Sequence, residues 1–538
     1  MILDGFGEGH PYKGNAITLA KTPTLTELKQ KYPWILLGAS GEAVGVPKGT
    51  QGGSEIGHFT IGAGRIVWQS LEEINLTIYS RSFFEKPDLV SACHRANSTA
   101  ESALHLIGMI SDEGVHSDIR HLFALLELAK LQKVKKVFIH AITDGRDVPE
   151  RSAAGFIKGI QAKIESLEME KEAKIATIIG RYYAMDRDSN WDRTKKAYDL
   201  YTLGKGAEDK VNGEAREGGL GHKVNGEARE GDLGHKVNGE AREGGLGQKD
   251  PLKALQNFYD KGTESDYYLT PIVLEKNGII KNEDAVIFWN FRSDRAKQLT
   301  HLFTGEADLE TEKQVRPFFV CIGPFSEKAP VVFTTPVVKN NLGETLANAG
   351  VKQLRIAETE KYAHVTYFLD SQIEEPFKGE ERIMIDSPKC PSYAEKPEMS
   401  AMGVTDALLP KLKSQEYQFI ALNFANCDLV GHSGNLQATI KAVETVDSCL
   451  GRIVPEAIKN EYCVLITGDH GNAEYMIYEE TGEPCPSHTT NPVPFIVVGN
   501  YKKLKDSGEL KDIAPTILEI MGIKQPEEMT GESLVKTV

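Results

Sequence analysis

The 538-residue chain has no run of 18 apolar residues, no Cys-x-x-Cys pair and no excess of positive charge. The first absence predicts no membrane span, and "MILDGFGEGH" has neither the basic nor the apolar region of a signal peptide. Seven scattered cysteines do not suggest a disulfide framework, which favours reduced thiols in the cytoplasm. The net charge of −15 excludes general nucleic-acid binding, because phosphate backbones require a basic surface.

Short apolar runs recur along the chain, and each is followed by a polar loop. Examples are "KVFIHAI", "IATIIG", "AVIFWNF", "FIALNF" and "YCVLIT", with helical patterns such as "SDIRHLFALLELAKLQK" between them. Alternating buried strands and helices predict an α/β fold with largely parallel sheets, and this length predicts two or more domains. In such sheets ligands bind beyond the carboxyl ends of the strands, so the polar loops are the expected site.

One segment has a different composition. "KVNGEAREGGLGH" at 210–222 recurs with small changes at 223–235 and 236–248, a period of 13 residues. A stacked solenoid needs about 20 residues or more per repeat and a hydrophobic face, and this repeat has neither. We expect a flexible surface insertion without a role in the site.

The stretch "QGGSEIGH", residues 51–58, places Ser54 after two glycines. Glycines before a serine are typical of an ordinary turn, and the Gly-x-Ser-x-Gly pattern of hydrolases does not match. The stretch alone therefore leaves open whether Ser54 is a turn residue or a hydroxyl exposed for chemistry.

Acids and imidazoles stand at several predicted strand ends. They are Asp4, Asp428, His432, Asp469, His470 and His488. Singly, each aspartate could cap a helix and each histidine could be a surface residue. Together with Ser54 they form an oxygen- and imidazole-rich set without a thiolate, which favours Mn²⁺ or Zn²⁺, and seven ligands suit two ions. Two metal ions would activate a serine hydroxyl and bind a phosphoryl group.

A second set carries positive charge. It comprises His116, Arg146, Asp147, Arg181, Arg187, Arg292 and Arg295. Guanidinium groups at strand ends in an acidic chain predict a site for a carboxylate or phosphate. The alternative is surface salt bridging, because each arginine has an aspartate nearby.

Nine segments together resemble the cofactor-independent phosphoglycerate mutases of the alkaline phosphatase superfamily. They are "ILDGFG", "GGSEIGHFTIGAGR", "DGRDV", "GRYYAMDRD", "FRSDRA", "LRIAETEKYAHVTYF", "NCDLVGHSG", "TGDHGNAE" and "SHTTNPVPF". The resemblance covers nearly the whole chain except the repeats. It implies a phosphatase-like domain, residues 1–68 and 338–538, with a transferase domain, residues 69–337, inserted into it. It also implies interconversion of 3-phosphoglycerate and 2-phosphoglycerate through a phosphoserine, with two Mn²⁺ and without 2,3-bisphosphoglycerate.

The resemblance also implies a role for each matching residue. Ser54 would be the nucleophile, Lys361 would offset charge on the phosphoryl oxygens, and Asp147 would act as acid and then base. One metal would be held by Asp4, Ser54, Asp469 and His470, and the other by Asp428, His432 and His488. Substrate would be bound by His116, Arg146, Asp147, Arg181, Arg187, Arg292, Arg295 and Lys361. Domain closure would have to exclude water.

The sequence departs from the family pattern in three places. Gly53 replaces an asparagine, Cys427 replaces a common proline, and only three residues precede Asp4, where the family has a full strand. A buried strand typically needs about five residues, so we expect that Met1 is not the natural start.

Three readings remain open at this stage. The arginine set favours the mutase over a phosphatase or phosphopentomutase of the same superfamily. The third reading is an inactive metal-binding scaffold, which the short N-terminus and Gly53 make plausible. We expect a monomer that acts on a small molecule, without nucleic acid or membrane as partner.

Overall fold

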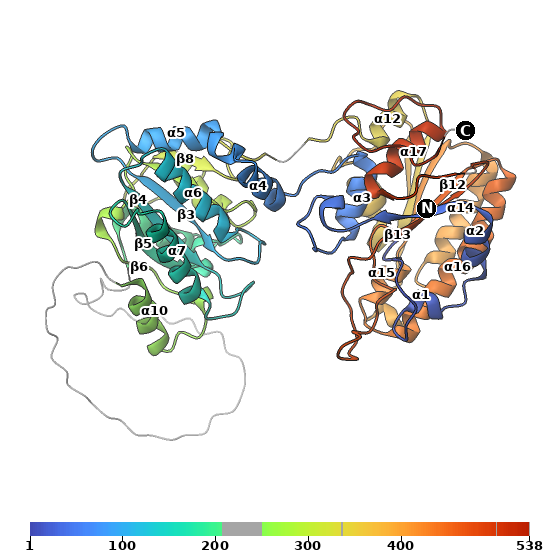
Figure 1. The fold of residues 1–538 in the computed structure, drawn as a ribbon, viewed down its shortest axis with the longest axis horizontal. Helices are drawn as coiled ribbons and strands as arrows, with labels where there is room; N and C mark the ends of the chain where they lie inside the picture. The colour runs from blue at the N-terminus through green and yellow to red at the C-terminus, as the bar shows by residue number, and fades with distance from the viewer. Residues whose placement is uncertain (207–249, 335–336, 502, 537–538) are drawn as a thin grey trace, which may run out of the picture. The chain divides into compact units, whose positions relative to one another are not determined.

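The computed structural model describes residues 1–206, 250–334, 337–501 and 503–536, so the repeats at 210–248 lie outside the described residues. The chain forms two compact units (Figure 1). The split unit comprises Met1–Glu72 and Pro336–Val538, and the inserted unit comprises Glu73–Thr335. The boundaries expected from the sequence, 68/69 and 337/338, lie within four residues of these. Each unit contains a sheet with helices, which confirms the α/β class.

The split unit is built on an eight-stranded sheet in the order β10-β9-β11-β1-β12-β13-β2-β14. β13 runs antiparallel to both of its neighbours, and the other pairs are parallel. The strands are β1 (Ile2–Leu3), β2 (Trp34–Gly38), β9 (Gln353–Glu358), β10 (Glu380–Ile385), β11 (Phe419–Phe424), β12 (Val464–Thr467), β13 (Val493–Val498) and β14 (Gly508–Glu509).

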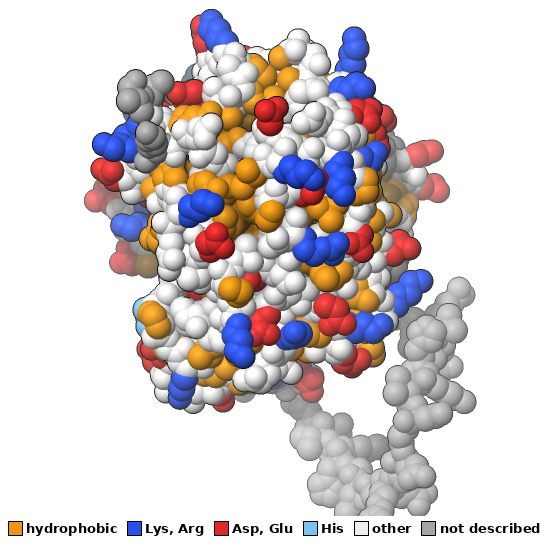
Figure 2. Space-filling view, turned by 90° about the vertical axis from the view of Figure 1, so that its right-hand side faces the viewer, with side chains coloured by type: hydrophobic (Ala, Val, Ile, Leu, Met, Phe, Trp, Pro, Cys, Tyr) orange, Lys and Arg blue, Asp and Glu red, His pale blue; other side chains and the backbone are white. Residues whose placement is uncertain are grey.

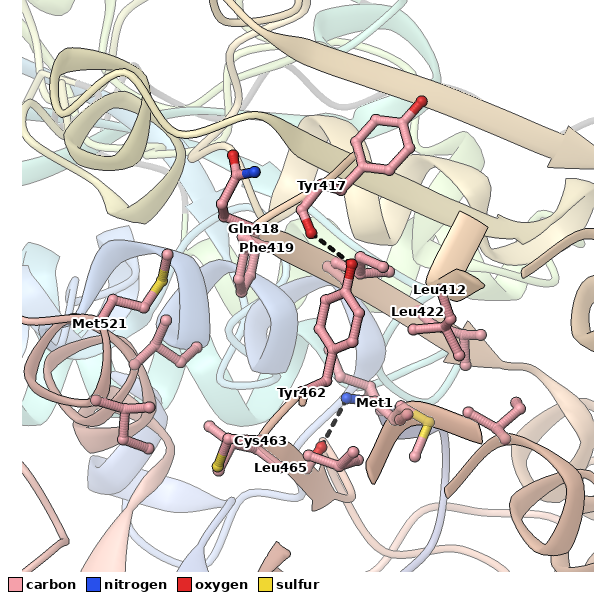
Figure 3. Close-up of a pocket in the computed structure, with 18 of the residues that line it drawn as sticks. Met1, Leu412, Tyr417, Gln418, Phe419, Leu422, Tyr462, Cys463, Leu465 and Met521 are labelled. Atoms are coloured by element: carbon pink, nitrogen blue, oxygen red, sulfur yellow. Dashed lines mark hydrogen bonds between the residues drawn. The ribbon is translucent and has the colours of Figure 1, made fainter. Parts of the chain in front are cut away.

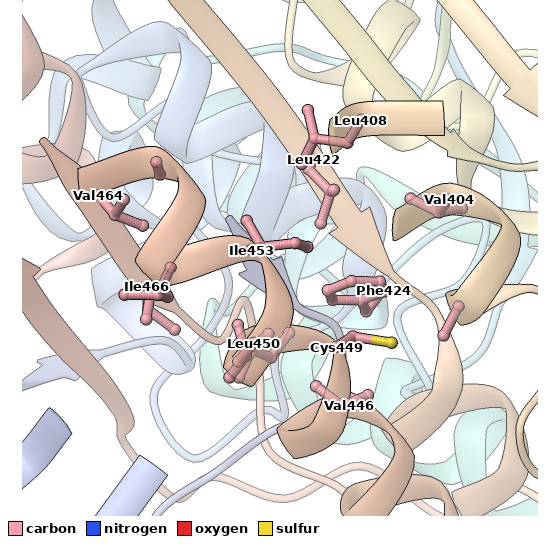
Figure 4. Packing of buried hydrophobic residues seen from close by; sticks show 14 of the residues in the cluster. Val404, Leu408, Leu422, Phe424, Val446, Cys449, Leu450, Ile453, Val464 and Ile466 are labelled. Carbon is pink, nitrogen blue, oxygen red and sulfur yellow. The ribbon is translucent and has the colours of Figure 1, made fainter. Parts of the chain in front are cut away.

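Helices cover both faces of this sheet (Figure 1). On one face, α2, α14 and α16 enclose a hydrophobic core that includes Leu408, Leu422 and Ile453 (Figure 4). On the other face, α3 and α17 pack over Leu37 and Phe495, and α3 contributes Ile61 to this core. The helices of the unit are α1 (Ala16–Leu19), α2 (Pro23–Lys31), α3 (Ser54–Ala63), α12 (Leu342–Asn348), α13 (Thr359–Ala363), α14 (Ala401–Ser414), α15 (Asn426–Gly431), α16 (Leu436–Lys459) and α17 (Ile513–Ile520).

The inserted unit is built on a six-stranded sheet in the order β6-β5-β4-β3-β7-β8, parallel except for β6. Its strands are β3 (Leu104–Ile110), β4 (Val137–Thr143), β5 (Ala173–Gly180), β6 (Ile272–Val273), β7 (Ala285–Phe288) and β8 (Phe318–Cys321). Strands β3 and β4 are buried at every residue, as continuous apolar runs in a parallel sheet require.

The helices that accompany this sheet begin with α4 (Ser70–Tyr79), which spans the boundary between the units. The others are α5 (Pro87–Ala96), α6 (Ile119–Leu131), α7 (Ala153–Ser166), α8 (Arg181–Ala184), α9 (Trp191–Leu203), α10 (Pro251–Asp260) and α11 (Lys297–Thr304). The predicted helical pattern at 117–133 corresponds to α6, which Asp118 caps by accepting a hydrogen bond from the Arg120 backbone N–H.

The face of the molecule seen in Figure 2 carries basic and acidic side chains interspersed with scattered hydrophobic groups. This face has no continuous basic track of the kind that nucleic-acid phosphates require. Within the described residues, no helix is both long and apolar enough to span a bilayer.

Candidate active site

The predicted metal ligands of the split unit meet at the carboxyl ends of neighbouring strands. Asp4 follows β1, Asp469 and His470 follow β12, and Asp428 lies on α15 directly after β11. These three strands are adjacent in the sheet, so their carboxyl ends converge. His488 comes from the loop that precedes the antiparallel strand β13, which brings it to the same edge.

Ser54 is the first residue of α3 and lies at the centre of this cluster. Its Oγ donates a hydrogen bond to Asp4 Oδ1 at 2.9 Å and lies 3.0 Å from His470 Nε2. The N-terminus of a helix carries partial positive charge, which favours an oxyanion or phosphate there. The structure therefore resolves the question that the sequence left open: Ser54 is a buried hydroxyl among charged groups, not a residue of a solvent-exposed turn.

Lys361, on α13 after β9, reaches into the same cluster. Its ammonium donates to Ser54 Oγ at 2.6 Å, to Asp4 Oδ1 at 2.7 Å and to Asp428 Oδ2 at 2.6 Å. Burial opposes the charge, but the two carboxylates outweigh it and raise the pKa of Lys361 above its usual value. Lys361 is therefore a fixed cation beside the serine oxygen.

The three predicted histidine ligands share one arrangement. Each Nδ1 lies near a backbone carbonyl: that of Gly471 for His470 (3.3 Å), of Pro486 for His432 (2.7 Å) and of Gly52 for His488 (2.8 Å). A carbonyl oxygen only accepts, so each Nδ1 carries a proton and each Nε2 faces the cluster, where it can bind a metal ion once it is deprotonated. Metal-ligating histidines are oriented in this way.

The ligand atoms fall into three overlapping groups within which all atoms lie within 4.8 Å of one another. The groups are Asp428, His432 and His488; Asp4, Asp428 and His470; and Asp4, His58 and Asp469. The first is the trio that the sequence assigned to one metal. The predicted partners Asp4, Asp469 and His470 are split between the other two groups, although His470 Nε2 lies 3.4 Å from Asp4 Oδ1 and 3.7 Å from Asp469 Oδ2.

Charge within the cluster is strongly coupled. Burial disfavours protonation of His470, but Asp469, Asp4 and Asp428 outweigh it and raise the pKa of His470 to about 10. Burial likewise opposes ionisation of Asp428, yet Lys361 holds its pKa well below the usual value. Three carboxylates in one buried cluster thus draw cations to it, either protons or a metal ion.

His58 and Asn423 belong to the cluster but were missed from the sequence. His58 Nδ1 donates to the Ser54 carbonyl at 2.8 Å, and its Nε2 accepts from Asn423 Nδ2 at 3.0 Å. The same amide donates to Asp4 Oδ2 at 2.7 Å. The available signal was spacing, because His58 lies four residues after Ser54 and hence on the same helix face.

Two glycines allow the ligands to approach one another. Gly5 follows Asp4 with φ +70°, and a Cβ there would lie 2.7 Å from the Asp428 Cα. A Cβ on Gly57 of α3 would lie 2.7 Å from the Asp469 backbone oxygen. At Gly53, by contrast, a Cβ would make ordinary contact with the His488 ring at 3.6 Å, so space does not exclude a β-carbon at this position.

The predicted anion-binding residues gather in the inserted unit. They follow β3, β4, β5 and β7, which are adjacent in its sheet. At the centre, the buried Arg181 donates from Nη1 to Asp144 Oδ1 at 2.5 Å and to Asp147 Oδ2 at 2.6 Å. Asp144, which the sequence analysis did not select, thereby fixes the guanidinium, while Arg181 Nε is buried without a hydrogen-bond partner.

His116 faces Asp147 and a second missed carboxylate, Asp294. Its Nε2 lies 3.9 Å from Asp147 Oδ2 and its Nδ1 lies 3.8 Å from Asp294 Oδ1. Burial and the charge of Arg181 lower the pKa of His116 to about 4, so the ring is neutral at pH 7. His116 Nδ1 is buried and has no hydrogen-bond partner, which leaves it available to a ligand.

The remaining arginines surround this centre. Arg187 and Arg292 both pair with Asp294, at 2.8 and 3.1 Å, and Arg295 donates to the Met185 carbonyl at 3.2 Å. Burial lowers the pKa of Arg295, and the charges of Arg181, Arg187 and Arg146 lower it further, so these guanidiniums lie close together. Such a concentration of positive charge, partly exposed, fits an anionic ligand.

Comparison with known proteins identifies the family of this chain. A model of the Metalloenzyme superfamily matches residues 1–525. The 2,3-bisphosphoglycerate-independent phosphoglycerate mutase of Clostridioides difficile is 44% identical over 546 residues, covering 99% of this chain and 98% of that protein. The 2,3-bisphosphoglycerate-independent phosphoglycerate mutase 1 of Methanosarcina acetivorans is 46% identical over 548 residues. The match covers 99% of this chain and 98% of that protein. The chain belongs to the 2,3-bisphosphoglycerate-independent phosphoglycerate mutase family.

A solved structure of this mutase family has the same fold over the whole chain. It is a crystal structure of Leishmania mexicana phosphoglycerate mutase at low cobalt concentration, with a TM-score of 0.58 and 26% sequence identity. The match covers 100% of this chain and 97% of the Leishmania mexicana chain. The match therefore includes both units, and the chain is a mutase-family enzyme of the metal-dependent superfamily.

The residues present fit divalent metal ions. His432 Nε2 and His488 Nε2, both lone-pair donors, face each other at 3.0 Å, an arrangement that a shared cation stabilises. Asp469 Oδ2 is buried without a hydrogen bond, since the nearby His58 Nδ1 bonds to the Ser54 carbonyl instead. Carboxylate and imidazole ligands without thiolate suit Mn²⁺ or Zn²⁺.

Proposed function

We propose that this enzyme interconverts 3-phosphoglycerate and 2-phosphoglycerate through a phosphoserine at Ser54, with two Mn²⁺ ions. The observation that carries the proposal is the position of Ser54 Oγ, within 3.0 Å of Asp4, His470 and Lys361 at the start of α3. A hydroxyl that donates to a carboxylate and accepts from an ammonium is prepared to become an alkoxide.

The metal ions would be held by the carboxylates and imidazoles of the split unit. The ligands are Asp4, Ser54, Asp469 and His470 for one ion and Asp428, His432 and His488 for the other. When bound, the ions supply positive charge that lowers the pKa of the serine hydroxyl and neutralises phosphoryl oxygens. His58 and Asn423 would orient Asp4 and the first turn of α3.

In the first half-reaction, Ser54 Oγ attacks the phosphorus of the substrate, and the ester bond to the glycerate oxygen breaks. The Ser54 proton leaves along its hydrogen bond to Asp4, and Lys361 stabilises the negative charge on the attacking oxygen. The departing glycerate oxygen receives a proton from Asp147.

In the second half-reaction, Asp147 accepts a proton from the other glycerate hydroxyl, whose oxygen attacks the phosphorus of the phosphoserine. The bond between phosphorus and Ser54 Oγ breaks, and Ser54 regains its proton from Asp4. Arg181 holds the Asp147 carboxylate, and the surrounding arginines bind the carboxylate of glycerate. We assign the phosphatase-like role to the split unit and the transferase role to the inserted unit.

The test is conversion of 3-phosphoglycerate, measured by coupling to enolase, without 2,3-bisphosphoglycerate. We expect turnover in the presence of Mn²⁺. Release of inorganic phosphate without isomerisation would show instead that the chain is a phosphatase. Absence of both reactions in metal-loaded protein would support an inactive scaffold.

A further inference from the structure

Lys361 lies on a short helical segment whose two ends are joined by a buried ion pair. The segment follows β9, begins with α13 and continues directly into one π-helical turn, His364–Phe368. A helix as short as α13 is not stable by itself, because fixing its first turn costs more conformational entropy than its few hydrogen bonds offset. The position of the Lys361 ammonium therefore depends on the contacts that hold the two ends of the segment.

The ion pair connects β9, before the segment, to the end of the segment after its π-helical turn. Arg355 Nη2 on β9 donates to Asp370 Oδ1 at 3.1 Å, and both side chains are fully buried. Lys361 lies between these two residues in the chain, so the ion pair closes the segment into a loop. A movement of Lys361 away from the active site would have to bend this loop or open it.

Asp370 also bonds to the strand next to β9. Its Oδ2 accepts from Arg382 Nη2 on β10 at 3.0 Å, and Arg382 lies opposite Arg355 in the pairing of the two strands. Like charges at facing positions of a sheet repel each other, so the two arginines need a carboxylate between them. With one oxygen on each strand, the Asp370 carboxylate is fixed in both position and orientation. We call Arg355, Asp370 and Arg382 the clasp.

Arg355 depends on Asp370 to compensate its charge. Its Nε and Nη1 are buried without a hydrogen-bond partner, and its guanidinium lies 5.2 Å from the centroid of the Phe419 ring. Figure 3 shows this ring next to Gln418, at the start of β11. Burial raises the pKa of Asp370 to about 6 although Arg355 opposes the shift, so the carboxylate is ionised at pH 7. A buried charge that loses its partner is strongly unfavourable, so the two residues hold each other in place.

The backbone at the end of the segment is constrained as well. Ser371 and Gln372 have φ +60° and +67°, in the left-handed region that residues other than glycine rarely adopt. Their N–H groups donate to carbonyls of the π-helical turn, at 3.0 and 2.7 Å. Asn341 Nδ2 donates to the Asp370 carbonyl at 3.0 Å. Such unfavourable conformations persist only where several contacts fix them together, as they do here.

The same segment packs against α3, the helix that begins with Ser54. A Cβ on Gly62 of α3 would lie 1.7 Å from the Leu369 carbonyl oxygen, so the two backbones are in direct contact. The rings of His58 and His364 meet edge to face, with centroids 5.4 Å apart. The clasp therefore holds the segment against α3, and with it the ammonium that bonds to the Ser54 hydroxyl at 2.6 Å.

We propose that Asp370 is a positioning residue of the active site, which through the clasp places the Lys361 ammonium against Ser54 Oγ. This inference rests on the proposed function, in which that ammonium stabilises the attacking oxygen. Placement matters for turnover, because a shift of about 1 Å in a reacting group can cost about 100-fold in rate. Loss of the clasp should therefore lower kcat, whereas KM, which we assign to the arginines of the inserted unit, should stay within about threefold.

The test compares Asp370→Ala with Asp447→Ala in Mn²⁺-loaded protein. Asp447 is the matched control, because its buried carboxylate accepts from the Thr24 and Leu25 N–H groups at 3.1 and 2.7 Å, away from Lys361. Both variants should lower the unfolding temperature, since each leaves buried donors without a partner. Only Asp370→Ala should lower kcat, by about 10- to 100-fold.

Asp370→Asn keeps the shape of the side chain and one acceptor oxygen, so it should recover part of the lost kcat. It also decides the test if Asp370→Ala does not fold. An equal fall of kcat in Asp447→Ala would overturn the proposal, because the loss would then follow from lower stability alone. No fall of kcat in the folded Asp370 variants would overturn it as well.

A second measurement does not require turnover. Lys361 is 3% exposed, so its acetylation by N-acetoxysuccinimide, followed by mass spectrometry, should be slow in the parent protein and in Asp447→Ala. It should be at least about tenfold faster in both Asp370 variants, because the segment opens more often. Equal rates in all four proteins would refute the clasp even if the parent is an active mutase. Faster acetylation in the Asp370 variants of a parent without turnover would support the clasp and refute the proposed function.

Discussion

The two clusters of charged residues differ in sign, burial and purpose. In the split unit, Asp4 and Asp469 are fully buried around a single buried ammonium, that of Lys361. In the inserted unit, Arg187 and Arg292 are about half exposed and share one carboxylate, Asp294. A buried excess of carboxylates requires cations, whereas half-exposed guanidinium groups favour the binding of an anion. A phosphate ester that reacts at a metal centre needs both a site that binds the metal cations and a basic site that binds its anionic groups.

The largest loss of activity should come from substitution of Ser54, which lies at the centre of the cluster in the split unit. Ser54→Ala should reduce mutase turnover by roughly 10⁴-fold or more, because no other hydroxyl takes its place. The fold should survive, since alanine is a good helix former and Ser54 starts α3. Ser40→Ala is the matched control, as this exposed hydroxyl bonds only to the Thr490 carbonyl. Comparable losses in both variants would contradict a special role for Ser54.

Removal of metal should affect the two units unequally. Chelation should abolish activity and speed amide exchange at 428–432 and 469–471, where carboxylates then repel one another. Exchange in β3 and β4 of the inserted unit should not change. Mn²⁺ should restore both activity and protection. Full activity in excess chelator after dialysis would rule out a metal-dependent reaction.

A substitution in the guanidinium cluster should lower kcat/KM for the substrate and leave the affinity for metal unchanged. Arg181→Lys should lower kcat/KM by about 10- to 100-fold, because lysine cannot hold Asp144 and Asp147 together with a ligand. Mn²⁺ affinity, measured by calorimetry, should remain within twofold. Arg452→Lys, which alters an exposed pair with Asp406, controls for a general loss of charge geometry. A parallel loss of metal affinity in Arg181→Lys would contradict the assignment of metal binding to the split unit and substrate binding to the inserted unit.

Metal affinity should rise with pH. The pKa of His470 without metal is raised to about 10, so at pH 7 its ring is protonated and metal must displace that proton. One released proton makes the apparent Mn²⁺ affinity increase about tenfold per pH unit below this pKa. Titrations of metal-free protein at one-unit pH intervals measure the slope. A flat profile from pH 6 to 9 would mean that His470 is not displaced by metal.

The smallest effect concerns Gly53. Its backbone is extended, φ −166°, and a Cβ there meets the His488 ring at 3.6 Å. Gly53→Asn should therefore fold normally and change kcat/KM by less than about threefold, with KM falling if the amide reaches the phosphate. Gly53→Ala separates the amide from the added Cβ. A large loss of activity in both variants would show that the loop has no room.

Much of the fold could be predicted from the apolar runs. The segment "FIALNF" coincides with β11, and the loops after the runs carry the residues of both clusters. Composition and spacing could not predict how the ligands are grouped, because the grouping depends on the strand order that places β1 between β11 and β12. The family resemblance alone gave the trio Asp428, His432 and His488. Asn423 was missed because it lies inside an apolar strand, where its amide faces Asp4.

The stretch around Ser54 could not by itself identify this hydroxyl as part of the site; the acids and imidazoles at other strand ends and the family resemblance did. Glycines before a serine predict a turn, yet Ser54 begins a helix whose neighbours are ionised groups from four separate segments. Asp144 and Asp294 were missed for a related reason, since an aspartate beside arginines is typical of a surface salt bridge. Only the tertiary structure shows that these two carboxylates organise the guanidiniums.

The most direct test of the proposed reaction is identification of the phosphorylated residue. Metal-loaded protein is mixed with phosphate-labelled 3-phosphoglycerate, quenched within a turnover and digested, and the labelled peptide is sequenced by mass spectrometry. We predict label on Ser54, formed fast enough for turnover and transferred to 2-phosphoglycerate when the quench is delayed. Full turnover with no label on Ser54, or label on another residue, would contradict a phosphoserine mechanism at this site.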